Sequence, residues 1–313
     1  MRADPINAFD PLDGTPVTVV FATFNYRDQL LEWIDAARAT CDHWRIVCVD
    51  DDLPRWLAAR GHGANAVDLY SVLPDAARHD FASMDRGDRM RALMPLRTRL
   101  FLHLVRNGRD FIHSDADALW VQDPRPWLAR HPGFDLLASQ GTVFPPAQYL
   151  RHRFVLCAGF FLCRANSRTV AYFETVEAHP GWDDQERMNL VLLNDLDGHW
   201  TTDRPHYLVR RRGTWQPTPA WMRLPLAALR PLGRWRLPGA PLSWWRPLRQ
   251  IRVSRRIVRG NFAGGLVVGV IPWHLIKRQM PRTAATLVQH GDLPGRNRPA
   301  SAPRTAAPPA GDP

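Results

Sequence analysis

Short apolar runs alternate with amphipathic stretches over the first two hundred residues of the chain. Residues 17–24 form an apolar run rich in β-branched side chains, and residues 27–39 follow with apolar positions spaced as on one face of a helix. A second apolar run, at 44–52, ends in acidic residues and precedes a helical stretch at 54–61 that ends at a glycine. This alternation predicts a parallel α/β sheet with helical crossovers.

The same rhythm continues to about residue 195. It predicts a helix at 95–108, strands at 109–114, 134–140 and 154–164, and helices at 167–179 and 183–195. Asp183 or Asp184 is placed to cap the amino end of the last helix. The expected fold class is therefore α/β, with a mostly parallel sheet flanked by helices.

The pattern changes after residue 203. Eight prolines between 205 and 247 exclude long helices, and we expect irregular structure that wraps the domain or contacts a partner. Residues 261–276 are apolar but short and glycine-rich, which indicates a buried strand or short helix rather than a membrane span. From Pro294 the chain is rich in Pro and Ala, which is typical of disorder. We expect three parts, residues 1–203, 204–293 and 294–313.

Charge is unevenly distributed along the chain. Its net charge is +11, yet from Arg204 to Gly291 there are 17 Lys and Arg residues and no Asp or Glu, so the remainder is mildly acidic. The same segment contains six tryptophans. Basic and aromatic side chains together suit an anionic membrane surface, nucleic acid or a phosphate-bearing substrate, and the sequence alone leaves these three open.

The four cysteines are Cys41, Cys48, Cys157 and Cys163, and none forms a CxxC pair. Free buried thiols in a reducing compartment are the simplest interpretation. The first residues lack the apolar segment of a signal peptide. We therefore expect a cytoplasmic protein, which the basic segment would bring to the inner face of the membrane if it binds lipid.

Two aspartates one residue apart, Asp115 and Asp117, end an apolar run in FIHSDADALWVQDP. In open parallel sheets, ligands bind outside the carboxyl ends of the strands. The pair is suited to a backbone turn, to a divalent metal that holds a diphosphate, or to a phosphoaspartate nucleophile. The last needs a lysine followed by an acidic pair, but the only lysine, Lys277, comes after Asp183 and Asp184. We therefore consider the nucleophile the weakest of the three.

That stretch, followed by VLCAGFFLCRANSRTVAYFE and WDDQERMNLVL, resembles the nucleotide-diphospho-sugar transferase family. The opening TVVFATFNYRDQLLEWI and RIVCVDDD are also similar, so the resemblance covers roughly residues 17–195. It implies a GT-A-like, Rossmann-like fold, to which the composition adds a basic Pro- and Trp-rich extension. It also implies transfer of a sugar from a nucleotide-diphospho-sugar to a hydroxyl acceptor, with retention of anomeric configuration. The acceptor would be a glycan, a glycolipid or an envelope polysaccharide.

The resemblance assigns the carboxylates and the residues around the nucleoside. Asp115 and Asp117 would bind Mn²⁺ or Mg²⁺, which holds the donor diphosphate. Thr23, Asn25 and Asp50 would lie near the nucleoside. Asn25 is equally suited to cap a helix.

It also assigns residues around the sugar. Arg97 would reach a phosphate, since a guanidinium makes bidentate phosphate contacts, and Gly159 would let the backbone approach the sugar. Asp184 and Gln185 would face the donor sugar and the reaction centre. The alternatives are a solvated Arg97, a packing role for Gly159, and Asp184 as a helix cap.

One position departs from the family pattern. A late histidine is expected to complete the metal shell, but the nearest match, VRGNF, has Arg259 in its place. Either a protein ligand is lost or Arg259 contacts the diphosphate, and the candidates His199, His206 and His274 are not distinguished. The rival for the whole chain is a nucleic-acid- or membrane-surface-binding protein without transferase activity. Because acidic strand ends would repel phosphate, we expect no nucleic-acid partner.

Overall fold

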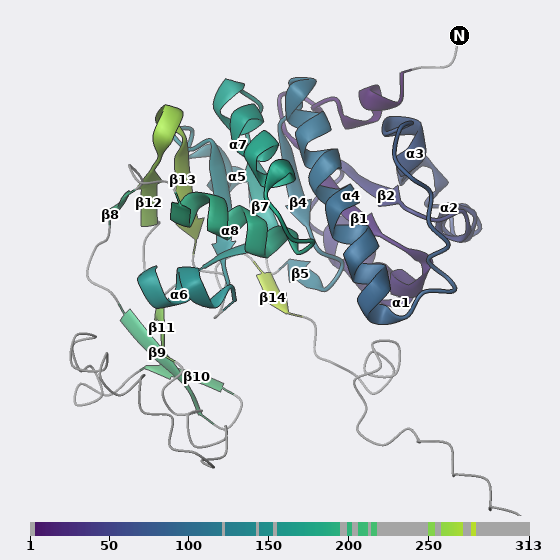
Figure 1. Ribbon diagram of the computed structural model, residues 1–313. Coiled ribbons are helices and arrows are strands. Elements are labelled where there is room, and N and C mark those ends of the chain that lie inside the picture. The colour runs from purple at the N-terminus through teal and green to yellow at the C-terminus, as the bar shows by residue number, and fades with distance from the viewer. Residues whose placement is uncertain are drawn as a thin grey trace, which may run out of the picture. The chain divides into compact units, whose positions relative to one another are not determined.

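A computed structural model describes residues 4–120, 123–141, 144–152, 155–194, 199–201, 206–211, 214–217, 250–253, 258–271 and 277–279 (Figure 1). The strands are β1 (Val17–Ala22), β2 (Trp44–Cys48), β3 (Ala66–Asp68), β4 (Phe111–Ser114), β5 (Ala118–Trp120), β6 (Leu136–Gln140), β7 (Leu156–Cys163), β8 (His199–Thr201), β9 (His206–Arg211), β10 (Thr214–Pro217), β11 (Gln250–Val253), β12 (Val258–Asn261), β13 (Val267–Ile271) and β14 (Lys277–Gln279). The α-helices are α1 (Arg27–Arg38), α2 (Asp52–Ala58), α3 (Leu69–Val72), α4 (Arg86–Arg106), α5 (Arg125–Ala129), α6 (Pro146–His152), α7 (Ser167–Ala178) and α8 (Asp184–Asn194).

The central sheet has nine strands in the order β3-β2-β1-β4-β7-β6-β13-β12-β8. β3, β2, β1 and β4 run parallel, as the sequence predicts. β7 lies antiparallel between β4 and β6, so β6 again runs in the direction of β4. The predicted α/β class with flanking helices is confirmed, and the sheet is mixed.

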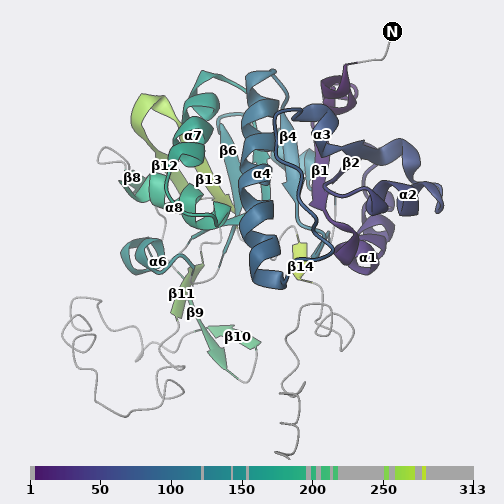
Figure 2. The same ribbon diagram turned by 45° about the vertical axis from the view of Figure 1, so that its right-hand side comes forward.

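Strand β1 shows how the sheet is buried on both faces. Val17, Val19 and Phe21 belong to the core that includes side chains of α4, α7 and α8. Val20 and Ala22 belong to a second core, with α1 and α2. Successive strand residues point to opposite faces, so a strand covered on both sides is apolar at nearly every position. The exception in β1 is Thr18, which is fully buried and has Cys41 Sγ 3.7 Å from its hydroxyl. Figures 1 and 2 both show α4, α7 and α8 on one face of the sheet.

Helix α4 is longer than the helix predicted for residues 95–108. It begins at Arg86, because the Asp85 side chain caps it by accepting a hydrogen bond from the Asp88 backbone N–H at 2.8 Å. Pro95 therefore lies inside the helix rather than at its start. There it removes one backbone hydrogen bond, while the buried residues Leu96, Leu100 and Leu104 hold the helix against the core.

Residues beyond 203 contribute strands, and the expectation of irregular structure is wrong where β9 pairs with β10 and β11. β13 pairs in parallel with β6, and β12 pairs with β13, which extends the central sheet. β13 confirms that the apolar stretch at 261–276 contains a buried strand. The β-branched residues Val267, Val268 and Val270 favour this outcome. Within the described residues, no helix is both long and apolar enough to cross a membrane.

The β12–β13 hairpin is fastened to the rest of the sheet by Asp135. Its Oδ1 accepts hydrogen bonds from Asn166 Nδ2 (2.9 Å) and Arg168 Nη2 (2.6 Å). Its Oδ2 accepts from Arg168 Nε (2.9 Å) and from the backbone N–H of Val267 (2.8 Å). Burial alone would raise the pKa of Asp135, but these donors outweigh it and lower the pKa below its ordinary value.

Replacing Asp135 with Asn should lower the free energy of unfolding by about 2 kcal/mol, because charge-assisted hydrogen bonds are lost at a buried carboxylate. Urea denaturation at pH 7 measures this. Since the folded-state pKa is depressed, the stabilisation is present above the ordinary value of about 3.9 and disappears as the pH falls through the folded pKa. Asp88→Asn, in an exposed pair with Arg91, is the control and should cost about 0–1 kcal/mol. Equal losses in the two variants would contradict the role of Asp135.

Candidate functional site

The carboxyl ends of the parallel strands carry most of the predicted residues. Asp115 follows β4, and a tight turn takes the chain through Asp117 into β5. The Asp115 N–H donates to the Gly159 carbonyl at 2.8 Å, and the Ala118 N–H donates to the Asp115 carbonyl at 3.0 Å. Asp115 and Asp117 are both partly exposed. The turn therefore presents both carboxylates at the same edge of the sheet as the ends of β1 and β2.

Arg97 joins Asp115 to Asp184 across this edge. From the middle of α4, its Nε and Nη2 donate to the two Asp184 carboxylate oxygens at 2.5 and 2.8 Å, while Nη1 donates to Asp115 Oδ1 at 2.7 Å. The side chains of Arg97 and Asp184 are only 9% and 2% exposed. Burial by itself would lower the pKa of Arg97, but the two carboxylates more than offset it and raise that pKa. The guanidinium thus pairs with two carboxylates, and the phosphate contact that the family resemblance implies for it stays a prediction.

Gly159 leaves room for the Asp115 carboxylate. A Cβ at this position would overlap Asp115 Oδ2 and lie 2.9 Å from its Cγ. The adjacent Ser114 fixes the same turn from the other side, because its hydroxyl accepts from the indoles of Trp33 and Trp120 at 3.1 and 3.2 Å. Residue 159 must therefore be glycine, because the Asp115 carboxylate occupies the space that a Cβ would need.

His113 lies beside the same carboxylate in the protein interior. Its Nδ1 is 3.2 Å from the Val19 carbonyl oxygen and its Nε2 is 3.3 Å from Asp115 Oδ1. Burial lowers the pKa of His113, although Asp115 acts in the opposite direction. A neutral ring carries a single N–H, so only one of these two oxygens accepts a hydrogen bond from it at a time.

The start of α8 holds the residues predicted at the reaction centre. Asp183 is the cap, accepting from the Glu186 N–H at 2.8 Å, which frees Asp184 to pair with Arg97. Gln185 Oε1 accepts from the Ala158 N–H at 3.1 Å, and Gln185 Nε2 donates to the Phe144 carbonyl at 2.9 Å. The side chain of Gln185 thus clamps β7 to the segment before α6.

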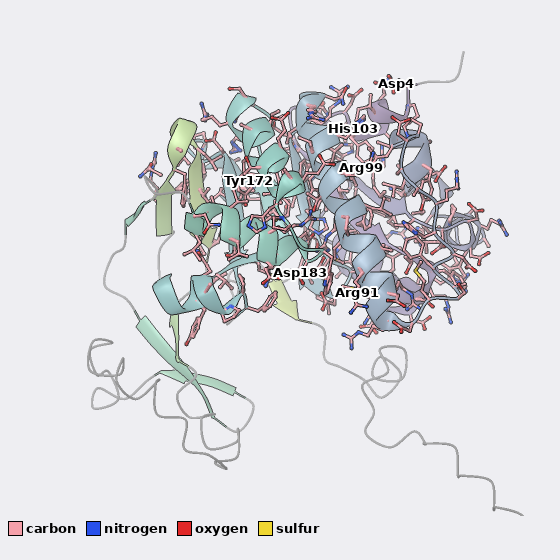
Figure 3. The ribbon with its side chains drawn as sticks, viewed as in Figure 1. Asp4, Arg91, Arg99, His103, Tyr172 and Asp183 are labelled. Atoms are coloured by element: carbon pink, nitrogen blue, oxygen red, sulfur yellow. The ribbon has the colours of Figure 1, made fainter. Side chains whose placement is uncertain are left out.

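Helix α8 is fixed in place by further contacts. Asn189, one turn after Gln185, bonds both backbone groups of Leu156 as a neighbouring strand would, at 2.8 and 3.0 Å. Tyr172 of α7, labelled in Figure 3, donates its hydroxyl to the Met188 carbonyl at 2.9 Å. Asp183 is also labelled there, at the amino end of α8. The position of Asp184 therefore follows from backbone contacts on two sides of the helix.

A cavity of about 500 Å³ lies beside the carboxyl ends of β1 and β2. Asn25 and Asp50 line it, together with Tyr70 and Arg78, whose guanidinium stacks 4.3 Å from the Tyr70 ring centroid. Thr23 is fully buried and does not line this cavity. Aromatic and polar groups around a concave site suit a flat heterocyclic ligand. Sequence patterns missed Tyr70 and Arg78, because neither follows a predicted strand nor belongs to a recognised motif.

Tyr26 is another residue that the sequence analysis missed. Burial raises the pKa of its phenol, and the negative charges of Asp115 and Asp117 add to that effect, while Arg86 and Arg89 oppose it. The Tyr26 hydroxyl lies 3.7 Å from Met90 Sδ, which places it beside the first turns of α4. In the sequence, only its position directly after Asn25 indicated that Tyr26 belongs to the site.

A second cavity, of about 510 Å³, lies at the opposite edge of the sheet. It is lined by residues before β1 and β4, such as Thr15 and Asp110, and by Arg164 after β7. It is as large as the first cavity, but the predicted site residues are all absent from its walls. Of the predicted site residues, Asn25 and Asp50 line the cavity at the carboxyl ends of β1 and β2, whereas the aspartate pair, Arg97 and the start of α8 do not line either cavity.

The side chains at the Asp115–Asp117 turn decide whether a divalent metal fits there. No group of three His, Cys, Asp or Glu side chains that could hold a metal occurs among the described residues. Asp115 and Asp117 supply two carboxylates on a tight turn. Mg²⁺ commonly takes one or two carboxylates and fills its remaining positions with water and substrate phosphate. The residues present therefore fit a metal that is held jointly with a diphosphate.

Arg259 does not lie beside the aspartate pair. Its strand, β12, is four positions from β4 in the sheet. Its guanidinium carbon lies 5.4 Å from the ring centroid of Phe134, which precedes the amino end of β6, and its Nε donates to Asn261 Oδ1 at 3.3 Å. In this arrangement it does not replace the expected histidine. The side chains of His199, His206 and His274 lie outside the described part of the chain.

Removal of Arg97 should destabilise the protein strongly. Arg97→Met leaves the buried Asp184 carboxylate without its partner, so we expect a loss of about 3–5 kcal/mol in urea denaturation. The double variant Arg97→Met, Asp184→Leu removes both buried charges and should recover much of that loss. A single variant that costs less than about 1 kcal/mol, or a double variant no more stable than the single one, would contradict a charge pair at this position.

Comparisons with known proteins identify relatives of the chain. A model of the nucleotide-diphospho-sugar transferase family matches residues 39–207. The beta-arabinofuranosyltransferase RAY1 of Arabidopsis thaliana is 23% identical over 165 residues, which cover 52% of this chain and 30% of the relative. The chain thus spans less than a third of that relative's length.

Several solved structures resemble the chain in part. The galactosyltransferase LgtC, in complex with donor and acceptor sugar analogs, is 16% identical with a TM-score of 0.37, covering 55% of this chain and 69% of its own. Mouse xyloside xylosyltransferase 1 is 10% identical with a TM-score of 0.40, covering 56% and 80%. Glucosyl-3-phosphoglycerate synthase from Mycobacterium tuberculosis, in complex with Mn²⁺ and uridine-diphosphate, is 15% identical with a TM-score of 0.35, covering 60% and 66%.

The family match extends over more than half of the chain, from the residue after α1 to the first two residues of β9, and includes the Asp115–Asp117 turn, Arg97 and the start of α8. These are the elements that build the carboxyl-end site. On this match, the chain belongs to the nucleotide-diphospho-sugar transferase family.

Proposed function

We propose that the protein transfers a glycosyl unit from a nucleotide-diphospho-sugar to a hydroxyl of a glycan or lipid-linked acceptor. The observation that carries the proposal is the Arg97 bridge between Asp115 and Asp184, which joins the aspartate turn to the start of α8. Family membership supports the donor class. The nearby cavity, lined by Asn25 and Asp50, offers space of the size that ligand sites usually have.

Asp115 and Asp117 would hold Mn²⁺ or Mg²⁺ together with the donor diphosphate. When bound, such a metal neutralises charge on the departing diphosphate. Arg97 keeps the Asp115 carboxylate in one orientation, and Gly159 leaves the space that this orientation needs. The protein's contribution is mainly positional and electrostatic.

The bond that breaks joins the anomeric carbon to the diphosphate oxygen, which leaves with the electron pair. The acceptor hydroxyl oxygen forms the new bond to that carbon, and its proton passes to the departing phosphate. We propose attack from the face that the nucleotide leaves, which retains the anomeric configuration. Asp184, held by Arg97, places negative charge beside the carbon as it becomes positive, and Gln185 shapes the wall next to it.

Replacing Asp115 and Asp117 together with Asn should abolish metal-dependent turnover and leave the fold intact. A panel of uridine- and guanosine-diphosphate sugars, with and without Mn²⁺, would be assayed for release of the nucleoside diphosphate. Glu174→Gln is the control and should match the wild type, because Glu174 of α7 forms an exposed pair with Arg106 of α4. Undiminished turnover in the double variant, or a wild type that releases no nucleoside diphosphate from any donor, would rule out the proposal.

The basic segment from Arg204 to Gly291 supports a proposed location at the cytoplasmic face of an anionic membrane, near a lipid-linked acceptor. Each Lys or Arg near such a surface contributes about 1 kcal/mol of attraction, which salt screens. Flotation with vesicles that contain phosphatidylglycerol should therefore recover the protein at low salt and lose it at high salt. Recovery equal to that with neutral vesicles would contradict the location.

A further inference from the structure

Three large apolar residues are strongly exposed in the described part of the chain. Leu12, Phe144 and Trp182 have exposed fractions of 47%, 41% and 40%. Leu12 precedes β1, at the edge of the sheet away from the aspartate pair, and lines the second cavity. Phe144 and Trp182 instead border the start of α8. Exposed apolar side chains that gather at one place usually mark a binding surface.

Contacts of α8 place both aromatic residues beside the proposed reaction centre. Trp182 is two residues before Asp184, so their Cα atoms are at most about 7 Å apart. The carbonyl of Phe144 accepts the hydrogen bond from Gln185 Nε2 at 2.9 Å. The backbones of Phe144 and Trp182 therefore lie within one side-chain length of Asp184 or Gln185.

The rings of Phe144 and Trp182 do not pack against another aromatic ring among the described residues. Trp33, Trp44, Trp56 and Trp120 each contact another aromatic ring, with centroids between 5.9 and 6.4 Å apart. Trp182 makes no such contact with a described residue, and neither does Phe144. An indole that remains exposed while its counterparts are packed has a face available to a ligand.

The charge around these rings limits what the ligand can be. Asp183, Asp184 and Glu186 lie within four residues of Trp182. Arg97 already pairs with Asp184, and the Glu186 N–H is used by Asp183. Asp183 and Glu186 are partly exposed and make no ion pair with a described residue, so they would repel an anionic ligand but not a neutral sugar. The C–H face of a sugar ring is apolar and slightly positive, which matches the negative face of an aromatic ring.

We propose that Phe144 and Trp182 form the acceptor subsite and pack against a ring of a neutral glycan, which places its hydroxyl next to the donor sugar. This inference rests on the proposed glycosyl transfer. The subsite adds to the proposed transfer a position for the acceptor, beside α8. It also excludes acceptors whose packed sugar ring carries a phosphate or a carboxylate.

The test compares Trp182→Ala and Phe144→Ala with Leu12→Ala, which removes an equally exposed apolar side chain from the other edge. Transfer to methyl glycosides of glucose, galactose, mannose, xylose and arabinose is measured alongside hydrolysis of the same donor by water. The acceptor KM should rise about tenfold or more in each aromatic variant, as for the loss of an aromatic contact. The ratio of transfer to hydrolysis should fall, and Trp182→Phe should restore part of it. Leu12→Ala should behave as the wild type.

A second measurement, saturation-transfer NMR with the same methyl glycosides and methyl glucuronide, reads acceptor binding without catalysis. Signals from the neutral glycosides should be lost in Trp182→Ala and Phe144→Ala. Unchanged KM values and signals in both variants, or a wild type that prefers the glucuronide, would overturn the subsite. A wild type that hydrolyses no nucleotide sugar would refute the proposed function instead, and the NMR result would still decide whether the rings bind a glycan.

Discussion

The Arg97 guanidinium is the contact on which the site depends. It joins a carboxylate at the end of β4 to one at the start of α8, and Arg97 and Asp184 are almost fully shielded from water. A buried charge is unfavourable unless it is paired and hydrogen-bonded. Each member of the Arg97–Asp184 pair is therefore charged at low cost because the other is present. The planar fork also fixes the direction of both carboxylates, which a flexible lysine would not do.

The sequence identified which segments meet at the site, but it did not predict how their side chains are paired. The pair Asp115 and Asp117 was recognisable because it follows an apolar run, and carboxyl ends of parallel strands meet at one edge. Arg97 was expected at a phosphate, since its residue type indicates anion binding in general. The partner it has, Asp184, lies 87 positions away, and such a pairing is determined by the packing of α4 on α8.

Local composition was a poor guide to the second half of the chain. Prolines between 205 and 247 suggested irregular structure, yet β9 pairs with β10 and β11. The strand expected within residues 261–276 is β13, which joins the central sheet beside β6. β14 also returns to β5, so that Gln279 pairs with Ala118, the residue after Asp117. Pairing with a strand that is already buried outweighs weak local preference. Tyr70 and Arg78 were missed because the cavity they line exists only in the folded chain.

The central claim is that the aspartate pair holds a nucleoside diphosphate through a shared divalent metal. Calorimetric titration of uridine diphosphate and guanosine diphosphate, with and without Mn²⁺, tests it most directly, because it needs neither the donor sugar nor the acceptor. For the wild type, Mn²⁺ should increase the affinity for one of these nucleotides about tenfold or more, a difference of about 1.4 kcal/mol. The same increase should be absent from the Asp115→Asn, Asp117→Asn variant. An increase of equal size in that variant, or no effect of Mn²⁺ on the wild type, would contradict the account.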